Sequence, residues 1–202
     1  MIKNIVFDLG NVILTGNAES VLKRLNINTE LREEIKNKFF NNFSNLDLEN
    51  ETIEEHFNNS NLSSEINDEI KYFLLNYYKF RDLNKEIINL IHDLKNKNYS
   101  IYILSNNNKE AYNFVKQLPE FKCIDGWIVS CDYHLVKPNK EIYLKLFETF
   151  NLKAEECFFV DDKEKNIKAG QLLGMSGHVL DYEKDGIDEL VKDLKANGVN
   201  VS

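Results

Sequence analysis

Short apolar runs that end in polar residues recur along the chain. The first run, Ile5 to Phe7, is closed by Asp8 and by a Leu-Gly-Asn turn. Later runs of the same kind cover Tyr99 to Leu104, Trp127 to Ser130, Cys157 to Val160 and His178 to Leu180. Because they are short, rich in β-branched and aromatic residues and bounded by turn residues, these runs predict buried strands.

Helical periodicity fills the intervals between the later runs. Apolar residues recur at spacings of three and four in segments 87–94, 110–117, 142–150, 164–173 and 187–196. Gly174 is a natural C-cap for the fourth of these segments. Strands that alternate with helices predict an α/β fold, with a mainly parallel, Rossmann-like sheet and helices on both of its faces.

The segment from residue 16 to residue 81 has a different character. It is rich in Asn, Glu and Lys, carries amphipathic helical stripes and has almost no strand pattern. We therefore predict a core domain of residues 1–15 and 82–202, with a small α-helical cap domain, residues 16–81, inserted into it. The alternative is that these helices belong to the main core.

Within this segment the pattern predicts several details. Asn41 to Asn50 is expected to be a loop because it is rich in Asn. Ser63-Ser64 is expected to cap a longer helix that carries the apolar residues from Ile66 to Tyr78. The aromatic residues of that helix are expected to form the core of the cap: Tyr72, Phe73, Tyr77 and Tyr78.

Length and charge narrow the functional classes. With 202 residues, 43% of them hydrophobic, the chain can bury the core of one domain with a modest insertion. It has 25 Lys and Arg against 33 Asp and Glu, a net charge of -8, which argues against nonspecific binding to nucleic acid or to an acidic membrane. The three cysteines lack metal-type spacing, and the chain shows neither a signal peptide nor an apolar run of membrane-span length. We expect a soluble cytoplasmic protein.

Three of the predicted strands end in polar clusters: Asp8, Ser105-Asn106 and Asp161-Asp162. Asp8 alone could equally start a turn. The carboxyl ends of parallel strands lie at one edge of a sheet, however, so all three clusters can converge. Carboxylates from two strand ends suit Mg2+, and a serine hydroxyl, turn amides and Lys137 can bind a phosphate. This set fits phosphoryl transfer, with an aspartate that attacks phosphorus to give an acyl phosphate.

These motifs resemble those of the haloacid-dehalogenase-like (HAD) hydrolases. The matching pieces are Phe7-Asp8-Leu9-Gly10-Asn11-Val12, Leu104-Ser105-Asn106, Lys137-Pro138 and Val160-Asp161-Asp162 followed by Asn166. They occur in the family's order and span nearly the whole chain. The helical segment between the first and second motifs looks like the small cap of the cap-type-one members.

The resemblance implies a magnesium site in which Asp8 is both the nucleophile and a ligand. The backbone carbonyl of Gly10 is expected to be a second ligand and Asp162 a third, with Asp161 assisting. The implied activity is Mg2+-dependent hydrolysis of a small phosphorylated metabolite through a phosphoaspartate on Asp8.

The resemblance also implies a site for the transferring phosphoryl group. Ser105 and Asn106 are expected to hold this group. Lys137 is expected to pair both with the phosphoryl group and with Asp8.

One position departs from the family's pattern. Most phosphatases of the family carry a second Asp two residues after the nucleophile, as general acid and base, and here that position is Gly10. Loss of a positioned acid-base group costs on the order of 10²–10⁴ in rate. The Leu-Gly-Asn-Val sequence also resembles the bacterial glucose-1-phosphate phosphatases. A sugar 1-phosphate has a more acidic leaving oxygen than an ordinary alcohol, which favours a sugar phosphate as the substrate.

Two other functions are compatible with the motifs. A degenerate member could bind a metabolite or a partner without turnover, and Gly10 supports this alternative. A haloacid dehalogenase also lacks the second Asp and needs no metal. Those enzymes replace the aspartate pair by a Ser/Asn pattern, so Asp161-Asp162 argues against dehalogenation.

Overall fold

A five-stranded sheet forms the centre of the computed structural model, which describes residues 1–16, 18–25 and 27–201. Neighbouring strands are all parallel, in the order β5-β4-β1-β6-β7. The strands are β1 (Asn4–Phe7), β4 (Ser100–Ser105), β5 (Gly126–Val129), β6 (Cys157–Asp161) and β7 (Ser176–Val179). The predicted α/β fold with a Rossmann-like sheet is confirmed.

The central strands are buried on both faces. In β1, Ile5 and Phe7 belong to one apolar cluster, whereas Val6 belongs to another. In β6, Phe158 and Phe159 are divided between the same two clusters. Successive side chains of a strand point to opposite faces, so a strand covered on both sides is apolar throughout and becomes polar only at its end.

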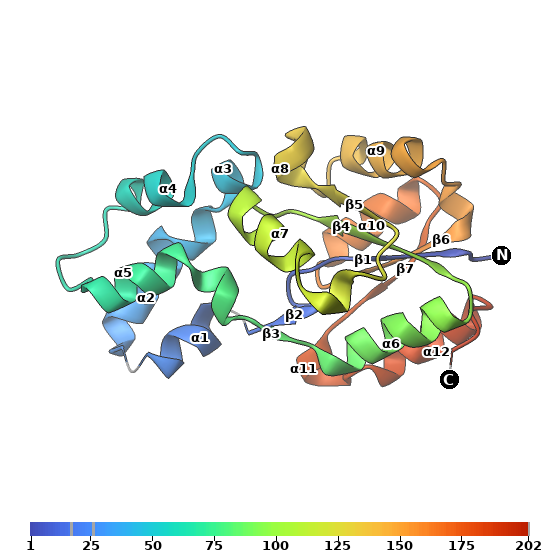
Figure 1. Cartoon of the computed structure of the whole chain (residues 1–202), viewed down its shortest axis with the longest axis horizontal. Coiled ribbons are helices and arrows are strands. Elements are labelled where there is room, and N and C mark those ends of the chain that lie inside the picture. The colour runs from blue at the N-terminus through green and yellow to red at the C-terminus, as the bar shows by residue number, and fades with distance from the viewer. Residues whose placement is uncertain (17, 26, 202) are drawn as a thin grey trace.

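Helices cover the two faces of the sheet (Figure 1). One apolar cluster joins the sheet to α6 (Lys85–Asn96), α7 (Lys109–Lys116) and α12 (Asp188–Ala196), and the other joins it to α9 (Lys140–Phe150) and α10 (Glu164–Leu172). The shorter elements are α8 (Ser130–Tyr133), α11 (Tyr182–Asp185) and the 3-10 turns η3 (Pro119–Phe121) and η4 (Ala154–Glu156). No helix of the described residues combines the length and the apolar character that crossing a bilayer requires.

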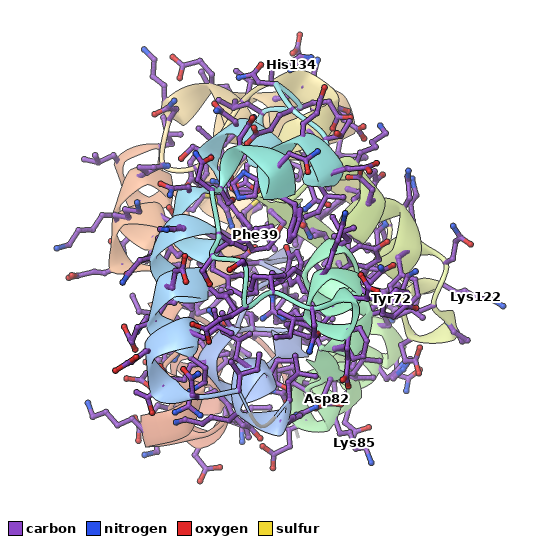
Figure 2. The ribbon with its side chains drawn as sticks, turned by 90° about the vertical axis from the view of Figure 1, so that its left-hand side faces the viewer. Phe39, Tyr72, Asp82, Lys85, Lys122 and His134 are labelled. Atoms are coloured by element: carbon purple, nitrogen blue, oxygen red, sulfur yellow. The ribbon has the colours of Figure 1, made fainter. Side chains whose placement is uncertain are left out.

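A set of short helices, which we call the helical unit, lies between β2 (Leu14–Thr15) and β3 (Asp82–Leu83). Its elements are α1 (Ala18–Arg24), α2 (Thr29–Lys38), η1 (Phe40–Asn42), α3 (Ser44–Asp47), α4 (Ile53–Asn59), α5 (Asp68–Leu75) and η2 (Tyr77–Phe80). An apolar cluster made of residues of this unit alone includes Phe39, which lies at its centre in Figure 2.

The two segments that lead into and out of the helical unit lie side by side. Strands β2 and β3 pair antiparallel, with Leu14 opposite Leu83. These two-residue strands were missed by the sequence pattern because alternation over two residues cannot be recognised. The assignment of the helical unit to a separate cap domain stays a prediction.

Three predictions within the helical unit were wrong. Segment 41–50 is not an open loop, because buried Leu46 anchors the short helix α3 there. Helix α5 begins at Asp68, and its N-cap is Asn67, whose side chain accepts a hydrogen bond from the Ile70 amide; Ser63-Ser64 lies outside it. Tyr72 does not join the core but is 58% exposed, because α5 turns its other face toward the helical unit.

Candidate active site

Three polar residues meet at the carboxyl edge of the sheet. Asp8 follows β1, Ser105 closes β4 and Asp161 closes β6, and β1 lies between the other two strands. Their exposed fractions are only 6%, 1% and 0%. In Figure 1, β1 runs from the N-terminus toward the helical unit, so this edge faces that unit. The predicted convergence of the three strand ends is confirmed.

A buried lysine connects two of the aspartates. Lys137 Nζ lies 2.9 Å from Asp8 Oδ1 and 2.6 Å from Asp161 Oδ2. It also donates a hydrogen bond to the carbonyl oxygen of Leu104, at 2.8 Å. Burial by itself lowers the pKa of Lys137, but the two carboxylates outweigh burial and raise this pKa above its ordinary value. The lysine therefore remains a cation in contact with Asp8.

Asp161 is held by donors on both of its oxygens. Oδ1 accepts hydrogen bonds from the Lys163 amide, at 2.8 Å, and from Asn166 Nδ2, at 2.9 Å. Oδ2 accepts from Asn166 Nδ2, at 3.0 Å, and contacts Lys137 Nζ. A carboxylate with this many donors has little capacity left for a further ligand, so its geometry suits the positioning of Lys137.

Asp162 has the opposite character. Its Oδ2 accepts a hydrogen bond from Asn11 Nδ2 at 3.0 Å, whereas its Oδ1 is a buried oxygen without a hydrogen-bond partner among the described residues. Asp8, Asp161 and Asp162 each offer a carboxylate oxygen, and these oxygens lie within 4.8 Å of one another. An unpaired buried oxygen beside converging carboxylates fits a divalent cation with oxygen ligands, of which Mg2+ is the common example.

The two residues expected to hold a phosphoryl group lie differently. Asn106 lines the cavity at this edge, and its side chain makes two hydrogen bonds with the backbone of Lys137, at 2.8 and 3.1 Å. Ser105 is 1% exposed and does not line this cavity, although it directly precedes Asn106. Asn106 thus fixes the loop that carries Lys137. The lining of the cavity includes Asn106 but not Ser105.

A second cation reaches the site from the end of the helical unit. Arg81 Nη2 donates to Asn11 Oδ1, at 3.0 Å, and to the Leu14 carbonyl, at 2.7 Å. Asn11, at a φ of 58°, then donates to Asp162, so the three side chains form a chain. Asn is one of the few residues that adopt this left-handed backbone readily. Arg81, which none of the sequence motifs includes, therefore belongs to the site.

A cavity of about 360 Å³ separates the sheet edge from the helical unit. The sheet edge contributes Asp8, Gly10 and Lys137 to its lining. The helical unit contributes Asp47 from α3 and Tyr77 from η2. A ligand in this cavity would lie between the two parts of the chain.

Asp47 stands out among the residues of the helical unit that line the cavity. Its carboxyl is half-buried, and no described side chain pairs with it by a hydrogen bond or an ion pair. Burial raises the pKa of this carboxyl from 3.8 to about 6; Asp8 acts in the same direction, and Lys163 and Lys137 act against it. Asp47 can therefore hold a proton near neutral pH.

The sequence did not single out Asp47, because it lies in a segment interpreted as a loop. Arg81 lacks an apolar run that would place it at a strand end, and Lys163 directly follows Asp161-Asp162 but belongs to none of the motifs. The one usable pattern was negative: Gly10 leaves a gap in a motif that otherwise matches, and this gap indicates that another group must be sought nearby.

A protein-family model supports the motifs. The model described as "Hydrolase: haloacid dehalogenase-like hydrolase" matches residues 2–174, which is most of the chain. The chain belongs to this family. This HAD-like hydrolase is thus an enzyme by family membership, and the predicted resemblance is confirmed at that level. The narrower resemblance to glucose-1-phosphate phosphatases stays a prediction.

Curated relatives are similar in sequence to part of this HAD-like hydrolase. The chain is 33% identical to the chloroplast flavin mononucleotide hydrolase 1 of Arabidopsis thaliana over 45% of this chain and 36% of that protein. It is 30% identical to the sesquiterpene phosphatase astK of Aspergillus oryzae over 46% of this chain and 48% of that protein. It therefore spans less than half the length of either relative.

Solved structures extend the likeness in fold to nearly the whole chain. A HAD family enzyme of Bacteroides thetaiotaomicron, in complex with magnesium and inorganic phosphate, superposes with a TM-score of 0.72. The superposition covers 92% of this chain and 97% of that enzyme, at 24% identity. At this identity the comparison supports a common fold, including the helical unit.

Proposed function

We propose that this HAD-like hydrolase is a Mg2+-dependent phosphatase that acts on a small phosphorylated metabolite through a phosphoaspartate on Asp8. The observation that carries the proposal is the placement of Asp8 between the Lys137 ammonium and a cluster of carboxylate oxygens that suits a cation. Lys137 contacts it directly, at 2.9 Å, and the unpaired oxygen of Asp162 lies beside it in a cluster suited to a cation. A carboxylate that attacks a phosphoryl dianion needs this neutralisation.

Asp8 is the proposed nucleophile. One of its oxygens attacks phosphorus, the bond from phosphorus to the leaving oxygen breaks, and water later hydrolyses the acyl phosphate. Lys137 contacts Asp8 and would face the phosphoryl oxygens, and Asp161 holds Lys137 in place. Because Lys137 is buried and paired, no reorganisation of solvent is needed as the charge shifts.

The proposed ligands of Mg2+ are Asp8, Asp162 and the backbone carbonyl of Gly10. Asp161 assists them from its position in the hydrogen bonds described above. When bound, the ion supplies positive charge that offsets the charge of the phosphoryl oxygens. Asn11 orients Asp162 through the hydrogen bond to Oδ2 and leaves Oδ1 for the metal.

The helical unit is the proposed cap, and it selects the substrate. The phosphoryl group would lie against Asn106 and Lys137, with Ser105 supporting the turn, and the organic part would extend toward the helical unit. Amide side chains such as Asn11 and Asn41 line the cavity, and they can both donate to and accept from hydroxyl groups. A hydroxylated substrate such as a sugar phosphate matches this lining.

The names of the relatives are consistent with this proposal. The protein of Arabidopsis thaliana is named a flavin mononucleotide hydrolase and that of Aspergillus oryzae a sesquiterpene phosphatase, so the names of these relatives point to very different organic groups. A cap that varies while the phosphoryl site is retained would account for this range.

Phosphate release from a panel of phosphorylated metabolites and an aryl phosphate, with Mg2+ and with excess chelator, tests the proposal. We expect turnover that depends on Mg2+. Chloride release from a 2-haloacid, unaffected by chelator, would instead establish a dehalogenase. Binding of metabolites without turnover of any of them would establish the degenerate alternative.

A further inference from the structure

The proposed phosphatase reaction needs a proton for the leaving oxygen, and the neighbourhood of Gly10 does not offer one. The backbone of Gly10 lies outside the left-handed region, and a Cβ there would come within 3.8 Å of Arg81 Nη1. Sterics therefore do not require glycine. A carboxyl group at this place would be held ionised by the adjacent guanidinium and would donate a proton poorly.

Asp47 approaches the same cavity from the other part of the chain. Asp8 lines it from the sheet edge and Asp47 from the helical unit. In an in-line displacement the leaving oxygen points away from the nucleophile. With Asp8 as the nucleophile, the leaving oxygen therefore points from the sheet edge into the part of the cavity that the helical unit lines.

We propose that Asp47 is the general acid and base of this reaction, supplied by the helical unit in place of a second aspartate at position 10. The inference rests on the proposed function and adds a residue to it. Asp47 belongs to no motif that identifies the family, so the assignment depends on its place in this cavity.

The proton balance follows from this assignment. Asp8 attacks phosphorus, the bond to the leaving oxygen breaks, and that oxygen takes the electron pair together with the proton of the Asp47 carboxyl. The alcohol departs and leaves Asp47 ionised. Asp47 then removes a proton from water as the water oxygen attacks phosphorus, so that Asp8 is released as a carboxylate and Asp47 is again protonated.

The surroundings of Asp47 match a group that exchanges protons. Lys163, Lys137 and Asp8 face it from the sheet edge, and Tyr77 faces it from η2. None of them forms a hydrogen bond or an ion pair with its carboxyl in the described structure, so the carboxyl is free to contact a substrate. Its raised pKa places the protonated and ionised forms close together in free energy near neutral pH.

The short helix that carries Asp47 is anchored to the sheet domain. Helix α3 packs against α8, and the two helices lie side by side in Figure 1. His134, at the end of α8, donates from Nδ1 to the carbonyl of Leu48 at 2.6 Å. Buried Leu46 holds the other side of the turn. These contacts fix the backbone on both sides of Asp47, as a positioned acid requires.

The decisive experiment compares Asp47→Asn with Glu65→Gln on two substrates in Mg2+ buffer. Glu65 is an exposed carboxylate of the helical unit that does not line the cavity, so it controls for the loss of one charge. p-Nitrophenyl phosphate has a leaving group that needs no proton, whereas glycerol phosphate leaves as an alkoxide unless it is protonated.

We expect Asp47→Asn to lower kcat for glycerol phosphate by about 10²–10⁴-fold, with a loss at least about tenfold smaller for p-nitrophenyl phosphate. KM should change little, and Glu65→Gln should behave as the wild type. An equal loss on both substrates, or a rise in KM alone, would overturn the inference, because Asp47 would then only hold the substrate. A wild type that hydrolyses neither of these substrates nor any metabolite of the panel would overturn the proposed function itself.

Two further readouts separate a proton donor from a structural residue. The wild-type kcat for glycerol phosphate should fall as the pH rises past about 6, and Asp47→Asn should lack this limb. In the Mg2+-loaded protein, carbon-13 NMR should show a carboxyl that titrates above the ordinary aspartate range and is missing in Asp47→Asn. A carboxyl signal of Asp47 in the ordinary range would contradict the assignment.

Discussion

The carboxyl edge of the sheet and the helical unit place aspartates in the same cavity under opposite conditions. At the sheet edge, Asp8 and Asp161 share the buried cation Lys137, at 2.9 and 2.6 Å. In the helical unit, Asp47 is half-buried without an ion pair among the described residues, and its pKa is raised to about 6. The sheet-edge carboxylates are paired with a buried cation, whereas Asp47 has no such partner and burial raises its pKa.

The difference shows how one type of side chain, aspartate, can act as a nucleophile and as a proton donor in a single site. A nucleophile must be ionised, so it is placed beside positive charge. A proton donor must be neutral, so it is placed where burial is not offset by a close cation. Because the two groups lie on different parts of the chain, burial contributes most to the pKa of Asp47, and the charges of Lys163, Asp8 and Lys137 contribute less.

The two regions are also held together by different means. Residues at the sheet edge are positioned by parallel strands that are buried on both faces. The helical unit relies on short helices with local caps, such as the capping box of Thr52 and Glu55, and on its own apolar cluster. We expect the sheet edge to be the more rigid of the two.

The largest effect is expected from Asp8→Asn, which removes the proposed nucleophile and leaves the helical unit unchanged. Turnover should fall by on the order of 10⁴-fold or more, because a covalent step cannot proceed through an amide. Steady-state kinetics and far-ultraviolet circular dichroism would check rate and fold together. Asp68→Asn, an exposed aspartate of the helical unit, serves as the control and should retain wild-type rates.

Removal of the cation at the sheet edge should reduce stability strongly. Lys137→Met leaves Asp8 and Asp161 buried without their positive partner, which we expect to lower the free energy of unfolding by about 3–5 kcal/mol. Urea denaturation would measure this change. Lys3→Met breaks an exposed ion pair with Glu156 and should cost no more than about 1 kcal/mol. If both variants lost similar stability, the buried contacts of Lys137 with Asp8 and Asp161 would be no more important than an exposed ion pair.

Magnesium should stabilise the sheet edge in particular. At a Mg2+ concentration of about 100 times Kd, the free energy of unfolding should rise by about 2.7 kcal/mol, because the ion binds the folded chain. Thermal denaturation with Mg2+ and with chelator would detect the shift, and Asp162→Asn should abolish most of it. If Asp162→Asn kept the full Mg2+ effect, the unpaired Oδ1 would not be a ligand.

The smallest effect concerns the pH dependence that Asp47 gives to the helical unit. Its folded-state pKa of about 6 exceeds the ordinary 3.8, so the folded chain binds a proton more tightly than the unfolded chain. Stability should therefore decrease as the pH rises from about 4 to about 6 and then level off. We expect a contribution of about 1–2 kcal/mol, reduced from the full shift by solvent screening.

Unfolding in urea between pH 4 and pH 8, in Mg2+-free buffer, would measure this dependence. Asp47→Asn should be more stable than the wild type above pH 6 and should lack this part of the pH profile. Glu65→Gln should keep it. An unchanged pH profile in Asp47→Asn would show that the Asp47 carboxyl is already ionised in the folded protein at low pH.

Sequence alone determined the sheet and the residues at its edge. Apolar runs closed by Asp8, Ser105 and Asp161 are local patterns, and parallel topology brings strand ends together whatever their separation along the chain. The order of the motifs, combined with this rule, was sufficient to bring the proposed site residues of these strands to one edge of the sheet. The boundaries of the strands and the main helices followed from periodicity because each buries a regular face.

Tertiary structure alone decided which groups complete the site. Asp47 reaches the cavity because α3 folds back onto α8, and Arg81 reaches Asn11 because β2 and β3 pair. Neither contact leaves a periodic trace in the sequence, since each joins an irregular turn to a distant element. The difference between Asp161 and Asp162 was also decided by the tertiary structure. In the sequence they are simply two adjacent aspartates. In the fold, surrounding donors saturate the carboxylate of Asp161, whereas Asp162 keeps a buried oxygen without a hydrogen-bond partner among the described residues.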